Sequence, residues 1–397
     1  MMKRQSKQKV ILLISTIFVV SLNLRPAVTS IGPMLDIIRR DLILTNTQVS
    51  LLTALPVFCM GLFALLSPWL NRRIGLSNSM YLMLIIIGAA TALRGVYSNY
   101  ISLVFSAILI GIAIAVIGPL LSAMIKQNFP ERATSVIGIY SFGMGVGSTL
   151  GAGLTAVFFS YTNSYSFSLA IWAVFAVVGI FFWKASQNVQ RQVKQQDEML
   201  KTEPKSPWRN KKAWLFLLFF GLQASAFFSI ITWLVPIALD SGMSLVQASS
   251  LLSLVTIIQI VLNLFFPIIY ERFPKRKLWL LFFLGMGLVA IGLMWTGVSL
   301  LLWISAFFMG VPLAGLFPIA LLFPLDETVT ADDTNAWTSM MQTGGFIMAG
   351  FLPMLIALIY DLTGDHHYTL MILFLLFIAM IFLTFLIGDR EVKTVNK

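Results

Sequence analysis

Arg25 is the residue whose place in the sequence most needs a chemical explanation. It lies inside an apolar stretch, residues 10–35, that is long enough to cross a membrane. A guanidinium in hydrocarbon costs about 2.5–3.5 kcal/mol on insertion scales, so this cation requires a partner or a function. Its planar donors suit a small anion or the oxygen atoms of a nitro group. The structural alternative is a fixed brace that donates hydrogen bonds to helix carbonyls.

Polar residues extend from Arg25 along the same stretch. If the stretch is one continuous helix, one face of it carries Ser21, Arg25, Thr29 and Gly32. Lipid does not tolerate such a stripe, whereas a central cavity does. Two nearby prolines, Pro26 and Pro33, can loosen the helix at this point.

Other polar side chains at mid-span depth can complete a substrate site. These are Asn23, Tyr140, Gln223, Gln259, Asn263 and Gln342. Neutral amides both donate and accept hydrogen bonds, so they suit an uncharged heterocycle as well as an anion. The alternative for each residue is an interhelical hydrogen bond, which contributes about 0.6 kcal/mol in a membrane. We predict substrate binding by Arg25 and Thr29 together with these residues.

The sequence places no Asp or Glu at mid-membrane depth. The acids nearest to the expected spans lie at helix ends: Asp36, Asp240, Asp361, Glu131 and Glu271. A buried carboxylate relay of the kind common in proton-driven carriers is therefore missing. Coupling stays open between facilitated diffusion, anion exchange, and proton movement through Tyr140, water and a helix-end acid.

No catalytic residue, metal site or cofactor is expected from the sequence. An enzyme would need a cluster of His, Asp or Cys at membrane depth, and the sequence has none. His366 and His367 are adjacent in a loop, and because adjacent side chains diverge, we expect no metal there. Three glycines at four-residue spacing, Gly143, Gly147 and Gly151, lack the strand and the Lys-Ser/Thr pair of a phosphate-binding loop. They predict a smooth helix face for close packing.

Composition identifies lipid as the solvent of this chain. Hydrophobic residues make up 58% of the 397 positions and charged residues 11%, which is too little polar surface for a water-soluble globule. Apolar stretches recur at the length that a membrane helix needs, about 20 residues. The twelve expected helices are 10–35, 47–70, 77–96, 100–124, 133–160, 166–186, 213–238, 245–270, 277–298, 299–325, 336–360 and 367–388.

The basic residues lie mostly on one side of these helices. If the N-terminus is cytoplasmic, all but four of the 27 Lys and Arg residues lie in the N-terminal tail, the cytoplasmic loops and the C-terminal tail. Arg39, Arg40 and Arg94 fall outside, and Arg25 falls within a helix. This asymmetry predicts a multi-pass protein of the cell (inner) membrane with both termini cytoplasmic. It also explains the net charge of +11 without nucleic acid.

The two halves of the chain repeat one another. Residues 111–119 align with 310–318, and 68–74 align with 267–273, both displaced by 199 positions. We therefore expect an all-α membrane protein of twelve helices in two pseudo-symmetric six-helix bundles. The predicted domains are 1–186, a cytoplasmic linker 187–212, and 213–397. Parallel six-helix repeats are typical of alternating-access carriers. In the first helix the displacement is 203, because Thr29 and Pro33 align with Thr232 and Pro236. Phe228 is then the repeat mate of Arg25, so the site is expected to be asymmetric.

Several segments resemble the cyanate/2-nitroimidazole transporter family of the major facilitator superfamily. The most specific is LNLRPAVTSIGP at 22–33, followed by LLTALPVFCMGLF at 51–63. The resemblance continues through IKQNFPER at 125–132, GLQ at 221–223 and DLTG at 361–364, so it covers nearly the whole chain. It implies the major facilitator fold, secondary carrier activity, and a substrate class of small anions or compact polar heterocycles. Members of this family are assigned both uptake and export.

The superfamily signature between helices 2 and 3 is altered here. Pro68 takes its glycine position and Arg72 its aspartate position, while Arg73 and Gly75 match. The loop before helix 11 has no basic residue, and its four charged residues are all acidic: Asp326, Glu327, Asp332 and Asp333. We expect these acids to pair with Arg72 and Arg73 as a cytoplasmic gate.

Pseudo-symmetry adds a second pair to this gate, because Glu271 would then meet Arg132. The alternative is that all these charges are solvated and only set topology, since exposed ion pairs contribute about 0–1 kcal/mol.

Together these features predict a carrier rather than an enzyme. We expect a secondary active or facilitative transporter of a small polar solute, such as cyanate or a compact nitro-heterocycle, that works by alternating access. The alternative is a proton-coupled multidrug efflux transporter, because 32 Phe and 19 Met can line a promiscuous cavity. Arg25 argues for the polar ligand. The expected partners are the small-molecule substrate and the lipid bilayer, with no nucleic acid and a monomeric protein.

Overall fold

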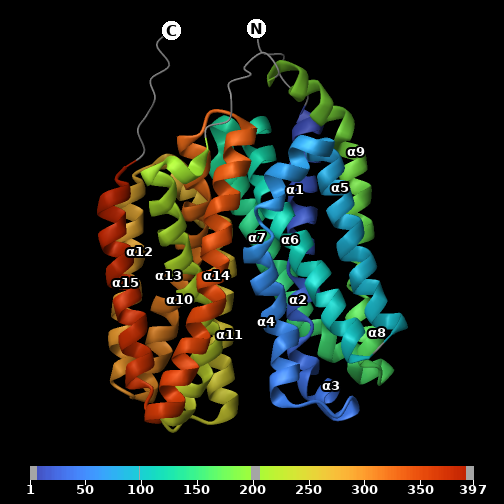
Figure 1. The fold of residues 1–397 in the computed structure, drawn as a ribbon. Coiled ribbons are helices and arrows are strands. Elements are labelled where there is room, and N and C mark those ends of the chain that lie inside the picture. Colours follow the sequence, from blue (N-terminus) through green and yellow to red (C-terminus); the bar gives the residue numbers. More distant parts are fainter. Residues whose placement is uncertain (1–6, 98, 198–205, 390–397) are drawn as a thin grey trace. The chain divides into compact units, whose positions relative to one another are not determined.

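The computed structural model describes residues 7–97, 99–197 and 206–389, and all of its regular elements there are helices. Figure 1 shows them as long ribbons. The first half contains α1 Lys7–Asn23, α2 Pro26–Thr29, η1 Gly32–Met34, α3 Leu35–Asp41, α4 Asn46–Leu62, α5 Leu66–Val96, α6 Tyr100–Asn128, η2 Pro130–Arg132, α7 Ala133–Thr162, α8 Tyr165–Ala170 and α9 Ala173–Asp197. The second half contains η4 Pro207–Arg209, α10 Lys211–Asp240, α11 Leu245–Arg272, α12 Arg276–Trp295, α13 Ser299–Glu327, α14 Ala331–Thr363 and α15 His367–Ile387.

Eleven helices of the described chain are long and apolar enough to cross a membrane, and a shorter apolar helix spans Leu51–Leu62. The short one belongs to the second expected span, 47–70, which is divided. The chain turns after α4 and starts α5, which bends at Gly75 with φ +82°. That φ favours glycine because it has no Cβ. Residues 66–74 therefore extend the second crossing, and the part of α5 after Gly75 makes the third.

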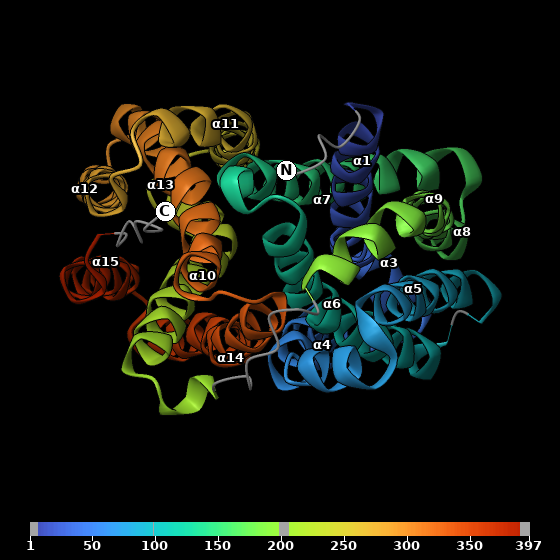
Figure 2. The same cartoon turned by 90° about the horizontal axis from the view of Figure 1, so that it is seen from above.

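The chain divides into two compact units whose boundaries differ from the expected ones. The first unit comprises 1–207 and 328–343, and the second comprises 208–327 and 344–397. Figure 2 shows the helices of each unit end-on. Helix α9 continues to Asp197, past the expected end at 186, and residues 198–205 of the expected linker lie outside the described residues. The start of α14 joins the first unit, where the Ser67 hydroxyl donates to Asn335 Oδ1 at 2.8 Å in a buried bond.

The first membrane span is broken at the residue that carries its charge. Helix α1 ends at Asn23, and Leu24 and Arg25 lie outside helical structure before α2 begins at Pro26. Proline disfavours the helical conformation in the residue before it. Arg25 departs from ideal helical geometry in φ, at −119°, although its ψ of −41° stays in the helical range. Proline also lacks the N–H that would continue the hydrogen-bond ladder. The condition for one continuous polar face, a single unbroken helix, is therefore not met, because Leu24 and Arg25 interrupt the helix between Ser21 and Thr29.

The glycine face of α7 packs directly against this break. A Cβ on Gly143 would lie 2.9 Å from the Phe18 carbonyl oxygen, and one on Gly147 would collide with the Leu22 carbonyl oxygen. A Cβ on Gly151 would lie 2.7 Å from Pro26 Cα. The predicted close packing is confirmed. Only glycine lets the α7 backbone approach α1 and α2 this closely.

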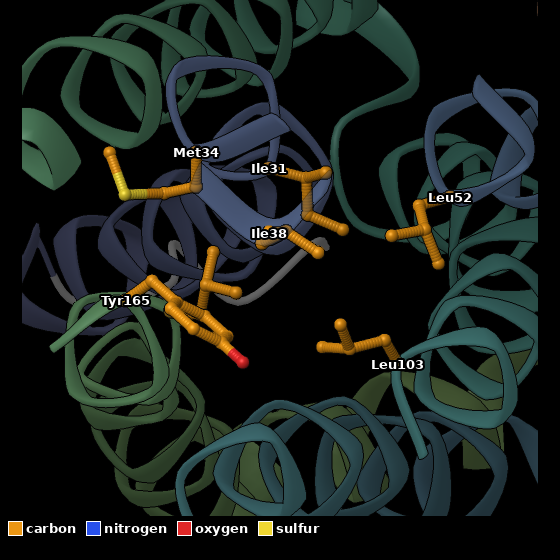
Figure 3. Close-up of a cluster of buried hydrophobic side chains, with 7 residues drawn as sticks. Ile31, Met34, Ile38, Leu52, Leu103 and Tyr165 are labelled. Atoms are coloured by element: carbon orange, nitrogen blue, oxygen red, sulfur yellow. The ribbon is translucent and has the colours of Figure 1, made fainter. Parts of the chain in front are cut away.

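A buried apolar cluster holds the chain beyond the break. Figure 3 shows six of its residues by label, Ile31, Met34, Ile38, Leu52, Leu103 and Tyr165, and Leu169 of α8 completes it. Apart from Ile31, which precedes η1, they come from η1, α3, α4, α6 and α8. The Tyr165 hydroxyl also donates to Asp41 Oδ2 at 2.9 Å. The break is thus fixed by α7 before it and by this cluster after it.

Replacement of Gly147 should show how much the first unit depends on this approach. We expect Gly147→Ala to lower the melting temperature in detergent by an amount equivalent to about 1–3 kcal/mol, because its methyl group meets a backbone carbonyl. Gly153→Ala on the same helix is the control, since nothing lies within 4 Å of its Cβ. Alanine there should be neutral or stabilising. Equal melting temperatures for the two variants would contradict the packing.

Candidate functional site

Arg25 lies at the break with its side chain half-buried. Its guanidinium interacts electrostatically with Tyr140 of α7, whose side chain is buried. Among the residues that the structure describes, no carboxylate forms an ion pair with Arg25. The structure therefore brings together two of the predicted site residues, a cation without a described acid partner and a phenol, at the first break of the span.

Two other predicted site residues near Arg25 are engaged within the bundle. The Thr29 hydroxyl lies 3.1 Å from the carbonyl oxygens of both Arg25 and Ser148, which fastens α2 to α7. Asn23 is buried, and its side-chain amide donates to the Val19 carbonyl at 2.8 Å. Its Nδ2 also packs on α9, 2.9 Å from where a Cβ of Gly179 would lie. For Asn23 these contacts are a hydrogen bond within α1 and packing against α9, so its role in substrate binding stays a prediction.

The remaining predicted residues are divided between the units. Gln342 lies in the first unit and packs on α6, with Oε1 2.8 Å from where a Cβ of Gly118 would be. Gln223, Gln259 and Asn263 lie in the second unit. The side-chain oxygens of Gln223 and Asn263 are buried without a hydrogen-bond partner, which costs about 1–3 kcal/mol each unless a ligand or water supplies a donor. A site that joins residues of both units stays a prediction.

Arg94 is a second arginine in the first unit whose side chain is removed from solvent, and its assignment to the external side of the membrane did not predict this burial. It lies in the last turn of α5 and is completely buried. Its Nε donates to the Ser106 hydroxyl at 2.8 Å, and Nη1 donates to the Ala27 carbonyl at 2.6 Å. Helix α2 ends within two residues of Ala27, so this carbonyl is one that a short helix leaves without an intrahelical donor. Arg94 thus performs the bracing role that was the alternative for Arg25.

Sequence reasoning missed Arg94 because hydropathy located it at a span end without saying where its side chain points. The available signal was its position: it still lies within the apolar stretch 77–96. An arginine two residues inside a span end can turn inward when the neighbouring helix is broken.

Two acids of the expected gate pair within the second unit. Asp326 Oδ2 lies 3.7 Å from Nη1 of Arg276, a buried arginine that also donates to the carbonyls of Gly388 and Asp389. Glu327 pairs with Lys212 at 3.3 Å. Both pairs close the same end of this unit, where α12 and α10 begin and α13 ends.

The other two acids do not pair with the expected arginines in this structure. Asp332 Oδ1 accepts from the Asn71 amide at 2.7 Å, and Asp333 Oδ2 accepts from the Thr330 hydroxyl at 2.9 Å. Arg72 donates to the Pro68 carbonyl at 3.3 Å, and the Arg73 guanidinium lies 5.2 Å from the centre of the Trp69 ring. The partner of Asp332 is therefore the neutral residue beside the two arginines. The pair of Glu271 with Arg132 would join the two units and stays a prediction.

Removal of the Arg94 donors should destabilise the break. We expect Arg94→Met to lower the melting temperature in detergent strongly, since hydrogen bonds to a charged group are worth about 1.5–3 kcal/mol each. Arg94→Lys keeps the charge but carries its donors on one nitrogen, so we expect an intermediate loss. Arg40→Met, at an exposed arginine of α3, is the control. A wild-type melting temperature for Arg94→Met would contradict the bracing role.

A double-mutant cycle should identify the partner of Asp332. We expect Asn71→Ala and Asp332→Ala to be non-additive by about 0.5–1 kcal/mol in thermal unfolding, because they remove the same exposed hydrogen bond. Arg72→Ala and Asp332→Ala should be additive. Non-additivity of Asp332→Ala with Arg72→Ala, and additivity with Asn71→Ala, would contradict this pairing and support the expected ion pair between Asp332 and Arg72.

Comparison with known proteins places these features in a family. The sequence profile of the Major Facilitator Superfamily matches residues 17–343. The chain is 32% identical over 349 residues to the cyanate transport protein CynX of Escherichia coli (strain K12), covering 87% of this chain and 89% of the relative. It is 28% identical over 385 residues to the 2-nitroimidazole transporter of the same organism, covering 96% and 97%. An uncharacterized transporter of Bacillus subtilis (strain 168), YycB, is 28% identical over 92% of this chain and 90% of the relative.

Solved structures share the fold at low sequence identity. The proton:xylose symporter XylE aligns with a TM-score of 0.79 at 10% identity, covering 96% of this chain and 95% of that chain. The transporter FucP aligns with a TM-score of 0.68 at 13% identity, covering 95% and 99%. The family and these structural neighbours are transporters and not enzymes. The chain is thus a multi-pass membrane transporter that belongs to the major facilitator superfamily and, within it, to the family of the cyanate and 2-nitroimidazole transporters.

Proposed function

We propose that this transporter carries a small anion, such as cyanate, or a compact nitro-heterocycle, and that Arg25 binds it. The observation that carries the proposal is the state of Arg25: a half-buried guanidinium at a helix break, beside Tyr140, with no carboxylate partner among the described residues. A charge in such a place is costly unless something neutralises it. We infer that the substrate is the partner that the described residues do not supply.

The chemistry of Arg25 and Tyr140 fits this substrate class. A guanidinium presents parallel donors that match two oxygens of nitrate, nitrite or a nitro group, and its positive charge also suits a terminal atom of the linear cyanate ion. A phenol adds one further donor from the side of α7. The assignment of cyanate and 2-nitroimidazole to two relatives supports the same class.

We propose that transport proceeds by alternating access in the cell inner membrane, with both termini cytoplasmic and the protein acting as a monomer. The unpaired amide oxygens of Gln223 and Asn263 are then the contribution of the second unit to the substrate site. They suit an N–H of a heterocycle, whereas Arg25 suits the anionic or nitro end of the substrate.

Uptake and counterflow in proteoliposomes with cyanate, nitrate, nitrite and 2-nitroimidazole would test the proposal. We expect Arg25→Ala to reduce transport of the preferred substrate about 10-fold or more, because a charge-assisted hydrogen bond is worth about 1.5–3 kcal/mol. Arg25→Lys keeps the positive charge but loses the pair of parallel N–H donors, so it should retain a part of anion transport. Tyr140→Phe should have a smaller effect.

Arg40→Ala is the matched control for loss of an exposed arginine. Undiminished transport by both Arg25 variants would exclude direct recognition by this residue. Transport of none of the four solutes by wild-type protein would exclude the substrate class.

A further inference from the structure

A cluster of three rings and one carboxylate lies where α10 and α14 end and α15 begins. The His366 ring stacks on Tyr360 with centroids 4.1 Å apart and an interplanar angle of 16°. Trp233 approaches both rings, at 5.6 Å from His366 and 5.8 Å from Tyr360. Asp240 Oδ2 lies 3.6 Å from His366 Nε2 and 3.4 Å from the Tyr360 hydroxyl. We call these four residues the His366 cluster.

The imidazole of His366 is buried and only partly satisfied. Its side chain is 7% exposed. Nδ1 lies 3.3 Å from the Thr369 hydroxyl, whereas Nε2 is buried and has no hydrogen-bond partner. The cluster also joins elements, because the Trp233 indole donates to the Pro353 carbonyl of α14 at 3.4 Å. His366 is thus a titratable group inside the packing that holds three helix ends together.

From this geometry we propose that His366 is a proton-binding site and that its protonation opens the cluster. An imidazolium here would be desolvated. It would also lie at the N-cap of α15, where the helix dipole disfavours a cation. The carboxylate that would stabilise it, Asp240, is half exposed and is shared with the Tyr360 hydroxyl.

The direction of the pH effect follows from the groups that face His366. Burial lowers the pKa of His366 from its ordinary value of about 6.5, while Asp240 from α10 and Asp365 from its own loop act in the opposite direction. Asp361 faces the cluster through Tyr360. Because the packed state holds a lowered pKa, it is favoured at neutral pH and loses stability as the pH falls below 6.5 through that pKa.

A proton-binding site at His366 would supply the titratable group that the expected spans lack, since no Asp or Glu lies at mid-membrane depth. No described acid pairs with Arg25 at the depth of the substrate site, whereas the His366 cluster controls the ends of α10, α14 and α15. Protonation would free these ends to move. Transport would then depend on the pH of the compartment that this end faces, which is expected to be the outside.

His367 provides the matched control. The chain has two histidines, and they are adjacent. His367 is exposed, and its Nδ1 lies 2.7 Å from Asp365 Oδ1. It does not share the stacking on Tyr360.

The first test follows the proton directly and does not depend on transport. In full-length His367→Gln purified through a histidine-free tag, ¹⁵N-histidine labelling leaves His366 as the single imidazole of the chain. We expect it to titrate with a midpoint below 6.5, and Asp240→Asn in the same background to lower the midpoint further. A midpoint at or above 6.5, or one that Asp240→Asn leaves unchanged, would overturn the proposal.

The second test measures transport as a function of pH and rests on the proposed function. With nitrate or whichever of the four solutes is transported, we expect wild-type and His367→Gln proteins to change rate severalfold between pH 7.5 and 5. His366→Gln should give a flat profile. A wild-type pH profile in His366→Gln would overturn the proposal, whereas loss of transport in Arg25→Ala with an intact His366 titration would bear only on substrate recognition.

Discussion

Backbone groups within a bilayer have no water to bind, so a break in a membrane helix must be satisfied by the protein. The break at Leu24 and Arg25 is the constraint on which the first unit depends. Arg94 supplies a donor to the Ala27 carbonyl, and Thr29 fastens the short helix to the Ser148 carbonyl. The glycines of α7 let its backbone lie against the same segment. Each of these contacts stabilises backbone that the helix break before Pro26 leaves without regular intrahelical hydrogen bonds.

Two arginines of the first unit, the buried Arg94 and the half-buried Arg25, differ in how they are satisfied. Arg94 is completely enclosed, with two of its donors bonded to protein oxygens. Arg25 lies at the break itself and faces a phenol. The pair shows why a buried cation cannot be assigned a role from its depth alone.

Charges in the second unit are used mainly to fasten helix ends. Arg276 binds Asp326 and the end of α15, and Lys212 binds Glu327. At the opposite ends of these helices, Asp240 and His366 lie among aromatic rings. The unit therefore carries stable ion pairs at one end and a titratable pair at the other. Only the latter can respond to pH near neutrality.

The sequence alone predicted the helical class, the twelve crossings and the family, because hydropathy, repeats and the segment around Arg25 are local signals. The same signals single out Arg25 as the candidate for substrate binding, which stays a prediction. The sequence also predicted the packing role of the α7 glycines, since four-residue spacing defines a helix face. Tertiary structure decided where side chains point. Arg94 turned inward, α14 began in the first unit, and Asp332 bonded to Asn71 rather than to Arg72. The physical reason is that the burial and pairing of a side chain depend on which helices become neighbours. The residue pattern along a single helix does not contain that information.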